Sequence, residues 1–450
     1  MNQAERLIRF LVYLYIFLLP WQTRLIWRDI RLNDFVWEYG RLSLYGTQLL
    51  LWLVLIIFLI WRLKQNNLAG FNFKAWLKSS GQVAPRAYWL AVLFFVISGL
   101  SIFWSGDWPL AYYRWLILLQ AGALMAVLLN LPFKFRSLAK VWVAAAAVQG
   151  IFAISQFFQQ AVGANKWLGL AFHLPTLAGS IILETDTGRW LRAYGSLPHP
   201  NILAGFLLVG FFLLLYLGLT ATKKPERVFV LASLLAIVPG LFFSFSRSAW
   251  LALLLSLFFL AFWLWRAEQK IWRRNFIKLF FLIVLLVAIL AFNFSSLLAA
   301  RLGGGQELEV NSIELRFAFT RQALTLIQQY PWQGIGLGHY TRGVFENINA
   351  TWPGYYYQPV HNIFLLAWAE LGIFGLLIFS YFLFYLLIAI TKTAKSPERV
   401  ILGLILLSLL IISLFDHYFW TLEVGVAIFW LIVALNIKYL GKNLGRLDTS

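Results

Sequence analysis

Residues 200–219, with the sequence PNILAGFLLVGFFLLLYLGL, decide the fold class of this chain. This stretch contains no Asp, Glu, Lys or Arg, and a helix of about 20 mostly apolar residues is long enough to cross a lipid bilayer. Similar stretches recur from one end of the 450-residue chain to the other. The sequence therefore predicts an all-α, polytopic membrane protein rather than a water-soluble domain.

We predict about 12 transmembrane helices, and we treat residues 1–450 as a single integral membrane domain. The expected spans are residues 8–23, 43–61, 87–104, 112–130, 138–160, 200–219, 228–244, 247–265, 276–298, 361–390, 400–415 and 420–437. Pro239-Gly240 and the polar run at 244–248 favour a tight turn between the seventh and eighth spans.

The composition limits the chemistry that this chain can perform. Charged residues make up only 12% of the chain, and hydrophobic residues make up 61%. The absence of cysteine excludes disulfides, cysteine-based zinc sites and thiol nucleophiles. The sequence also lacks a phosphate-binding loop and the spacings typical of a metal site, so we expect neither a metal nor a cofactor.

Charge is distributed very unevenly between the loops on the two sides of the membrane. With the N-terminus inside, the inner loops carry 24 of the 37 Lys and Arg residues but only 5 of the 18 Asp and Glu residues. The inner side therefore holds the whole net charge of +19, as the positive-inside rule requires. This pattern predicts that both termini lie in the cytoplasm. The high charge is explained by topology, and we expect no nucleic acid as a partner.

The outer side has two long connections, residues 161–200 and 299–360. The second, between spans nine and ten, is expected to be partly helical, with a helix at 312–329 capped by Asn311 and supported by Glu314 three residues later. Arg321 falls on the polar face of that helix, which favours a solvated side chain. Arg316 falls on its mostly apolar face, where an arginine needs an anionic partner.

Several polar residues lie where spans begin on the outer side. The positive N-terminal ends of these helices converge there and favour anions. The residues at these positions are Arg114, Asn201, Arg247 and His361. Pro359 suits the first helical position, which places His361 in the first turn as a neutral imidazole that can accept a proton. The ordinary alternatives are arginines that reach toward lipid headgroups and a histidine that caps its helix.

Other polar residues are weaker candidates. Asp416, beside His417 in the last outer loop, is a possible partner of the site, and His339 is an alternative base. His173, His199, His339 and His417 are all weaker candidates for a functional role than His361. Glu370 lies too deep to orient His361 and is interpreted as a buried residue at a helix contact.

Four motifs in this order resemble the bacterial O-antigen ligase/polymerase family. They are SRS at 246–248, Arg316 in the long outer loop, GIGLG at 334–338, and HNIFL at 361–365 followed by ELGIFG at 370–375. The resemblance covers mainly residues 195–375. His339, directly after the glycine run, departs from the expected pattern.

The resemblance implies a glycosyltransferase that works without metal or nucleotide in the inner membrane, with its active site on the periplasmic side. The donor would be a glycan on undecaprenyl pyrophosphate. His361 would be the general base, and Arg247 and Arg316 would bind the pyrophosphate, with Arg301 as a possible third. We favour lipid A core as the acceptor, as in an O-antigen ligase. A second glycan repeat (a polymerase) and a protein hydroxyl (an O-oligosaccharyltransferase) remain open.

The main competing hypothesis is a transporter or flippase of lipid-linked glycans. Such proteins place polar residues near the middle of the bilayer and often contain repeated halves. Here the polar residues gather at the outer ends of the spans, and no internal repeat is evident. The sequence therefore favours the transferase.

Overall fold

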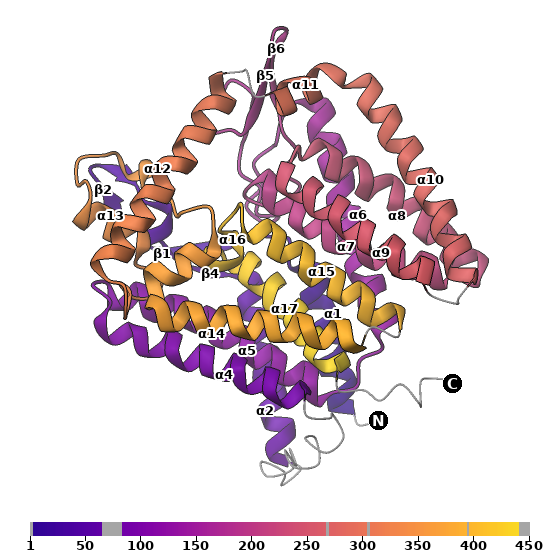
Figure 1. Ribbon diagram of the computed structural model, residues 1–450, viewed down its shortest axis with the longest axis horizontal. Helices are drawn as coiled ribbons and strands as arrows, with labels where there is room; N and C mark the ends of the chain where they lie inside the picture. The colour runs from indigo at the N-terminus through magenta and orange to yellow at the C-terminus, as the bar shows by residue number, and fades with distance from the viewer. Residues whose placement is uncertain (1–2, 65–82, 267–269, 304–306, 394–395, 441–450) are drawn as a thin grey trace.

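The computed structural model describes residues 3–64, 83–266, 270–303, 307–393 and 396–440, and most of them are helical (Figure 1). Twelve of the helices in these ranges correspond one to one with the twelve predicted spans. They are α1 (Gln3–Leu18), α2 (Gly46–Lys64), α4 (Val83–Leu100), α5 (Trp108–Asn130), α6 (Phe135–Gln159), α7 (Pro200–Thr220), α8 (Lys224–Phe243), α9 (Arg247–Arg266), α10 (Lys270–Asn293), α14 (Ile363–Thr393), α15 (Pro397–Ser413) and α17 (Glu423–Leu440). The prediction of an all-α, polytopic membrane protein is confirmed.

Ten of these helices are long and apolar enough to cross a membrane, counting only the described residues. The other two, α1 with 16 residues and α15 with 17, are slightly shorter than the about 20 residues that a perpendicular crossing needs. Both pack against longer helices, α1 against α2 and α15 against α9 and α17. The chain is therefore a multi-pass membrane protein.

Helix α7 forms the centre of the molecule. Every residue of its apolar stretch is buried, whereas α10, at the edge, buries 11% of its stretch. Small residues let the neighbours of α7 approach one another closely. A Cβ added to Gly150 of α6 would lie 2.3 Å from the Ala236 carbonyl of α8. Close packing of this kind holds helices together where lipid removes the hydrophobic driving force.

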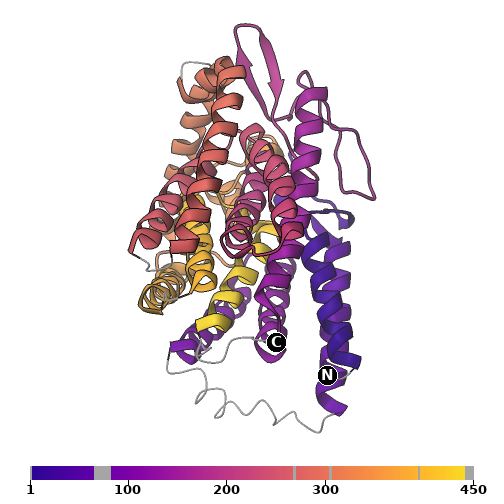
Figure 2. The same ribbon diagram turned by 90° about the vertical axis from the view of Figure 1, so that its right-hand side faces the viewer.

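Short helices and strands gather at one end of the long helices, opposite the start of α1 and the end of α17 (Figures 1 and 2). The short helices are α11 (Ser295–Gly303), α12 (Glu307–Gln329), α13 (Tyr340–Asn347) and α16 (Tyr418–Thr421), with 3-10 turns η1 (Glu38–Gly40), η2 (Ser101–Trp104) and η3 (Gly354–Tyr356). The strands form three antiparallel pairs: β1 (Arg24–Arg28) with β4 (Leu42–Tyr45), β2 (Arg31–Leu32) with β3 (Phe35–Val36), and β5 (Ile182–Thr185) with β6 (Gly188–Leu191).

Two predicted helix starts were wrong. Helix α12 begins at Glu307, so Asn311 lies inside the helix and does not cap it. Helix α14 begins at Ile363, and the Asn362 side chain caps it by accepting hydrogen bonds from the backbone N–H groups of residues 364 and 365 at 2.9 and 3.1 Å. Asparagine is a strong N-cap residue, so it fixes the helix start downstream of Pro359 and His361.

Two local breaks position the functional residues. The expected turn between α8 and α9 is present and contains Phe245, which is buried with φ of +47°. Helix α14 is interrupted at Gly372, where φ is +69° and ψ is −176°. The segment before α13 pairs with the freed backbone there, since Gly336 donates to the Glu370 carbonyl at 2.9 Å and Ile373 donates to the Pro331 carbonyl at 3.0 Å.

Candidate functional site

A cavity of about 1120 Å³ lies at the end where the short elements gather. Its walls come from the loop before α7, the turn and strands between α1 and α2, helices α11 and α12, and the segments before α14 and α17. The polar side chains that line it include Tyr39, Arg192, His199, Asn201, Arg301, Arg316, Gln358, His361, Asp416 and His417. Residues from five distant parts of the sequence therefore meet in one space.

His361 faces this cavity from the loop that leads into α14. Its ring stacks on Phe319 of α12, with centroids 5.8 Å apart, and meets the His417 ring edge-on at 5.0 Å. Its Nδ1 atom is buried and has no hydrogen-bond partner among the described residues. Burial lowers the pKa of His361, and Arg316 lowers it further, while Asp416 and the Pro359 carbonyl oppose the shift. His361 is therefore neutral at neutral pH and able to accept a proton.

Two arginines are held by successive carbonyls of the turn between α8 and α9. Arg192 Nε donates to the Ser244 carbonyl at 2.8 Å, and Arg301 Nε donates to the Phe245 carbonyl at 2.9 Å. The two side chains are 4% and 7% exposed. One comes from the segment after β6 and the other from α11, so this turn brings two guanidinium groups to the same wall of the cavity.

Asp416 forms the opposite end of a short polar chain that begins at Arg192. Arg192 Nη2 donates to Asn201 Oδ1 at 2.7 Å, and Asn201 Nδ2 donates to Asp416 Oδ2 at 2.8 Å. Burial raises the pKa of Asp416, but the neighbouring histidines and Asn201 outweigh it and leave the pKa lowered. Asp416 is thus a buried carboxylate that can stabilise positive charge on a nearby ring.

His199 and His417 flank this carboxylate as neutral rings. Burial lowers the pKa of each to about 3. His199 caps α7, because its Nδ1 accepts a hydrogen bond from the Asn201 backbone N–H at 3.0 Å. Within the described ranges, no three His, Asp or Glu side chains are arranged to hold a metal ion.

Helix α12 presents one of its two candidate arginines to the cavity. Arg316 is partly buried and lines the cavity beside Phe319, Leu315 and Ser312. Arg321 is exposed and is absent from the lining. Asn311, which does not cap the helix, also lines the cavity.

Tyr39 links three loops at the edge of the cavity. Its hydroxyl donates to Gln358 Oε1 at 2.9 Å and lies 3.5 Å from His417 Nε2, while His417 Nδ1 lies 2.8 Å from Thr421 Oγ1. Gln358 is three residues before His361. This chain therefore fixes the loop that carries His361.

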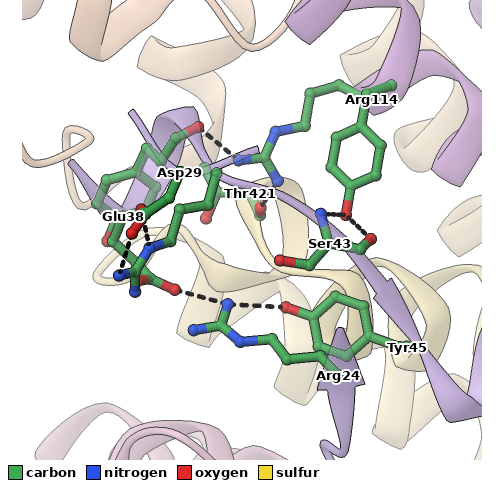
Figure 3. A network of polar contacts seen from close by, with 10 residues as sticks. Arg24, Asp29, Glu38, Ser43, Tyr45, Arg114 and Thr421 are labelled. Atoms are coloured by element: carbon green, nitrogen blue, oxygen red, sulfur yellow. Dashed lines mark hydrogen bonds and ion pairs between the residues drawn. The ribbon is translucent and has the colours of Figure 1, made fainter. Parts of the chain in front are cut away.

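Arg114 of α5 contacts the backbone of two of these loops. Its guanidinium donates to the carbonyls of Tyr39 and Thr421. Figure 3 shows Arg114 beside Thr421, and Arg24 between Glu38 and Tyr45 of the first loop. Arg114 therefore holds the backbone of these two loops in place. Its side chain does not line the large cavity.

Two further sequence candidates lie outside the lining of the cavity. His339 is buried, and its Nε2 contacts Glu346 Oε2 at 3.3 Å. Arg247 begins α9 directly after the turn and is partly exposed. It lies three residues after Ser244 and two residues after Phe245, whose carbonyls hold Arg192 and Arg301.

Sequence reasoning missed Arg192 and Tyr39. Arg192 is surrounded in sequence by Trp190, Leu191, Ala193 and Tyr194, and an arginine among such residues shortly before a span is a signal that could have identified it. Tyr39 has no comparable local signal. Its side chain acquires its role from contacts with residues more than 300 positions away.

A comparison with known protein families finds a match for part of the chain. Residues 231–380 match the family model Wzy_C, described as O-Antigen ligase. The match runs from α8 to the middle of α14 and includes Arg247, Arg301, Arg316 and His361, whereas Arg192, Asn201 and Asp416 lie outside it. None of the curated proteins matches the chain.

Proposed function

We propose that this chain, which belongs to the O-antigen ligase/polymerase family, transfers a glycan from undecaprenyl pyrophosphate to an acceptor hydroxyl. The family makes it a glycosyltransferase-like enzyme in broad terms, and the donor and the mechanism are our proposal. The main support for this proposal is that buried guanidinium groups and a neutral His361 line the same cavity.

The arginines suit a diphosphate leaving group. Arg301 and Arg316 approach the cavity from α11 and α12, and Arg247 follows the turn that holds Arg301. Arginine binds phosphate through a planar fork of N–H donors. Cations placed where charge develops lower the barrier to breaking the bond between sugar and phosphate. We assign Arg301 and Arg316 to the pyrophosphate, and we assign Arg247, which lies beside the turn and outside the cavity lining, as a third contact.

His361 serves as the general base. The acceptor oxygen attacks the anomeric carbon of the donor sugar while His361 takes the hydroxyl proton. The bond between that carbon and the phosphate oxygen breaks, and its electron pair leaves with undecaprenyl pyrophosphate. Asp416 stabilises the imidazolium that forms, because its carboxylate favours a positive charge on His361.

The acceptor that we favour is lipid A core, which would make the protein an O-antigen ligase. A glycan repeat and a protein hydroxyl are the alternative acceptors. We place the protein in the bacterial inner membrane with both termini in the cytoplasm and the cavity facing the periplasm. The unequal distribution of Lys and Arg between the two sets of loops supports this orientation.

Transfer by purified protein tests the proposal. The assay contains undecaprenyl-pyrophosphate glycan, one of the three acceptors, and a chelator. We expect product with one acceptor, and loss of product in His361→Ala and Arg247→Ala, with Arg321→Ala as the control. Full activity in both variants would refute the site, and no transfer to any acceptor would refute the function. Labelling of cysteines introduced near Lys223 from the periplasm would refute the orientation.

A further inference from the structure

We propose that Glu370 is a positioning residue, which acts through Trp420 to hold Asp416 and His417 in place beside His361. This inference rests on the proposed function and concerns the placement of its general base. Glu370 belongs to α14, is 2% exposed and has no part in the mechanism described above. It lies nine residues after His361, too deep in the helix to contact that ring, so its effect on the base has to pass through other residues.

The carboxyl group of Glu370 joins three separate segments. Its Oε2 accepts a hydrogen bond from Trp420 Nε1 of α16 at 2.8 Å, and its Oε1 accepts one from the Tyr340 backbone N–H at 3.4 Å. The Glu370 carbonyl accepts a further hydrogen bond from the Gly336 N–H at 2.9 Å. A buried carboxyl group is costly unless contacts of this kind satisfy it. Glu370 therefore ties α14 to α16 and to the segment before α13.

Helix α16 transmits the position of Trp420 to His417. The helix is a single turn that begins directly after His417. The backbone N–H groups of Trp420 and Thr421 both donate to the His417 carbonyl, at 2.9 and 3.1 Å. A shift of Trp420 therefore moves His417, and Asp416 beside it.

His361 lies at the other end of the helix segment that carries Glu370. Because α14 is interrupted at Gly372, its outer part is a separate helical segment, with Glu370 near the interruption and His361 just before its first residue. The His361 ring meets the His417 ring edge-on at 5.0 Å. The hydrogen bond between Glu370 and Trp420 thus joins the two segments that carry the base and the carboxylate assigned to it.

The alternative is that Glu370 only stabilises the fold. In that case, a variant that stays folded should keep its kinetics. A positioning role predicts a lower kcat with an unchanged KM for the donor, because the lost alignment matters in the transition state and not in ground-state binding. Asp416 is also held by Asn201 at 2.8 Å, so loss of the Glu370 contact should displace Asp416 without releasing it. A displacement of about 1 Å can lower the rate about 100-fold.

Steady-state transfer by the purified full-length protein tests the inference. In Glu370→Gln and in Trp420→Phe we expect kcat to fall about 10- to 100-fold and the donor KM to change by less than about 2-fold. Gln has one carboxamide oxygen where Glu has two oxygens, so it cannot keep both contacts. Phe keeps the packing of this ring against Phe94 and Phe379 but lacks the N–H. In an Asp416→Asn background, Glu370→Gln should lower kcat by less than about 3-fold further, because both changes act through the same group.

Matched controls are available for both substitutions. Trp142 of α6 is buried, and its Nε1 donates to the Phe206 carbonyl at 3.3 Å. Glu398 of α15 accepts a hydrogen bond from the Tyr216 hydroxyl at 3.0 Å. Trp142→Phe and Glu398→Gln remove equivalent contacts away from the cavity, and we expect kcat to stay within about 2-fold of the wild type. Thermal unfolding of every variant reports whether it is folded.

The histidine rings provide a second measurement that needs no transfer. The chain contains five histidines, so labelling of histidine with carbon-13 gives five ring signals in an NMR spectrum. His361→Ala and His417→Ala assign two of them. In Glu370→Gln and Trp420→Phe, both of these signals should move, because the two rings change their relative position. The signal of His173, which stacks on Tyr194 with centroids 4.2 Å apart, should not move.

The outcomes separate the two proposals. If the wild-type protein transfers no glycan, the proposed function is wrong, and the histidine signals alone decide whether Glu370 positions His361. If the wild type is active and folded Glu370→Gln and Trp420→Phe keep their kcat, or if the signals of His361 and His417 stay in place, the role of Glu370 is overturned. An equal loss of kcat in the wild-type and Asp416→Asn backgrounds would also overturn it. If Glu370→Gln does not fold, Trp420→Phe decides the question.

Discussion

The two ends of the helix bundle use buried and partly buried arginines in different ways. At the end opposite the cavity, Arg136 of α6 contacts both carboxylate oxygens of Glu226 on α8 at 2.6 and 3.1 Å, and Lys140 contacts the same carboxylate at 3.1 Å. At the cavity end, Arg192 and Arg301 are held by backbone carbonyls of the turn before α9.

This difference has a functional meaning. A carboxylate partner orients an arginine and also cancels its charge, which suits a contact between two helices. The carbonyl contacts of Arg192 and Arg301 hold two guanidinium groups at the wall of the cavity, which suits a site for an anion. Substitutions at the cavity end should therefore change the rate of transfer more than the stability, and substitutions at the other end should do the reverse.

The largest effect is expected at His361. His361→Ala should lower the rate of transfer by about 100- to 10,000-fold, the range for loss of a general base. The thermal unfolding midpoint should fall by only a few degrees, because the ring loses its packing against Phe319 and His417 while its buried Nδ1 has no hydrogen-bond partner among the described residues. His339→Ala is the control at a buried histidine outside the cavity lining. Equal loss of transfer in both variants would contradict the assignment of His361.

The two arginines of α12 give the next largest effect. Arg316→Ala should reduce transfer about 100-fold, because it removes a cation from the leaving group. Arg321→Ala, five residues away on the exposed side of the helix, should reduce it by less than about 3-fold. Initial rates at saturating acceptor measure both. The reverse order would refute the helix-face argument.

The pH dependence of transfer should show the lowered pKa of His361. The neutral ring is the active form, so the rate should be constant near neutral pH and should fall as the pH drops through the pKa of His361, below 6.5. Beneath that pKa the rate should fall about 10-fold per pH unit. A midpoint above 6.5 would show that a different group is the base.

The smallest effect is expected at the other end of the bundle. Glu226→Gln should lower the free energy of unfolding by about 1 kcal/mol, because Arg136 and Lys140 lose their partner in a partly exposed contact. Transfer should be unchanged. Thermal unfolding and the transfer assay measure the two quantities, with Glu184→Gln in the exposed pair with Arg189 as the control. A loss of transfer without a loss of stability would contradict the view that this end of the bundle serves stability and not chemistry.

The long helices could be predicted from sequence because their signal is local. Twenty apolar residues without charge form a span whatever the rest of the chain does, and each of the twelve predicted spans has its helix. Helix starts were harder to predict. Asn311 is a good capping residue, yet α12 begins four residues earlier, at Glu307, so the capping pattern did not mark the helix start.

The cavity could be predicted only in part because it is assembled from distant segments. His361 and Arg316 stood out through their positions on expected helices. Arg192 and Tyr39 acquire their roles through contacts with residues 52 and 319 positions away, and no local pattern encodes such pairs. The strands of the first loop, which hold Tyr39 at the cavity, were also missed for this reason.

The interruption of α14 at Gly372 lets a small rotation at this residue displace the outer part of the helix, from Ile363 to Gly372. A side chain at residue 372 would place Cβ 1.9 Å from the Trp332 carbonyl, so this joint requires glycine. The arm from Gly372 to Ile363 is about 14 Å long. A rotation of about 10° at the joint would move its tip, next to His361, by about 2 Å, the difference between a hydrogen bond and none. The backbone bonds from residues 335, 336 and 373 brace the joint on both sides, and the position of the base therefore depends on how stiffly that brace holds.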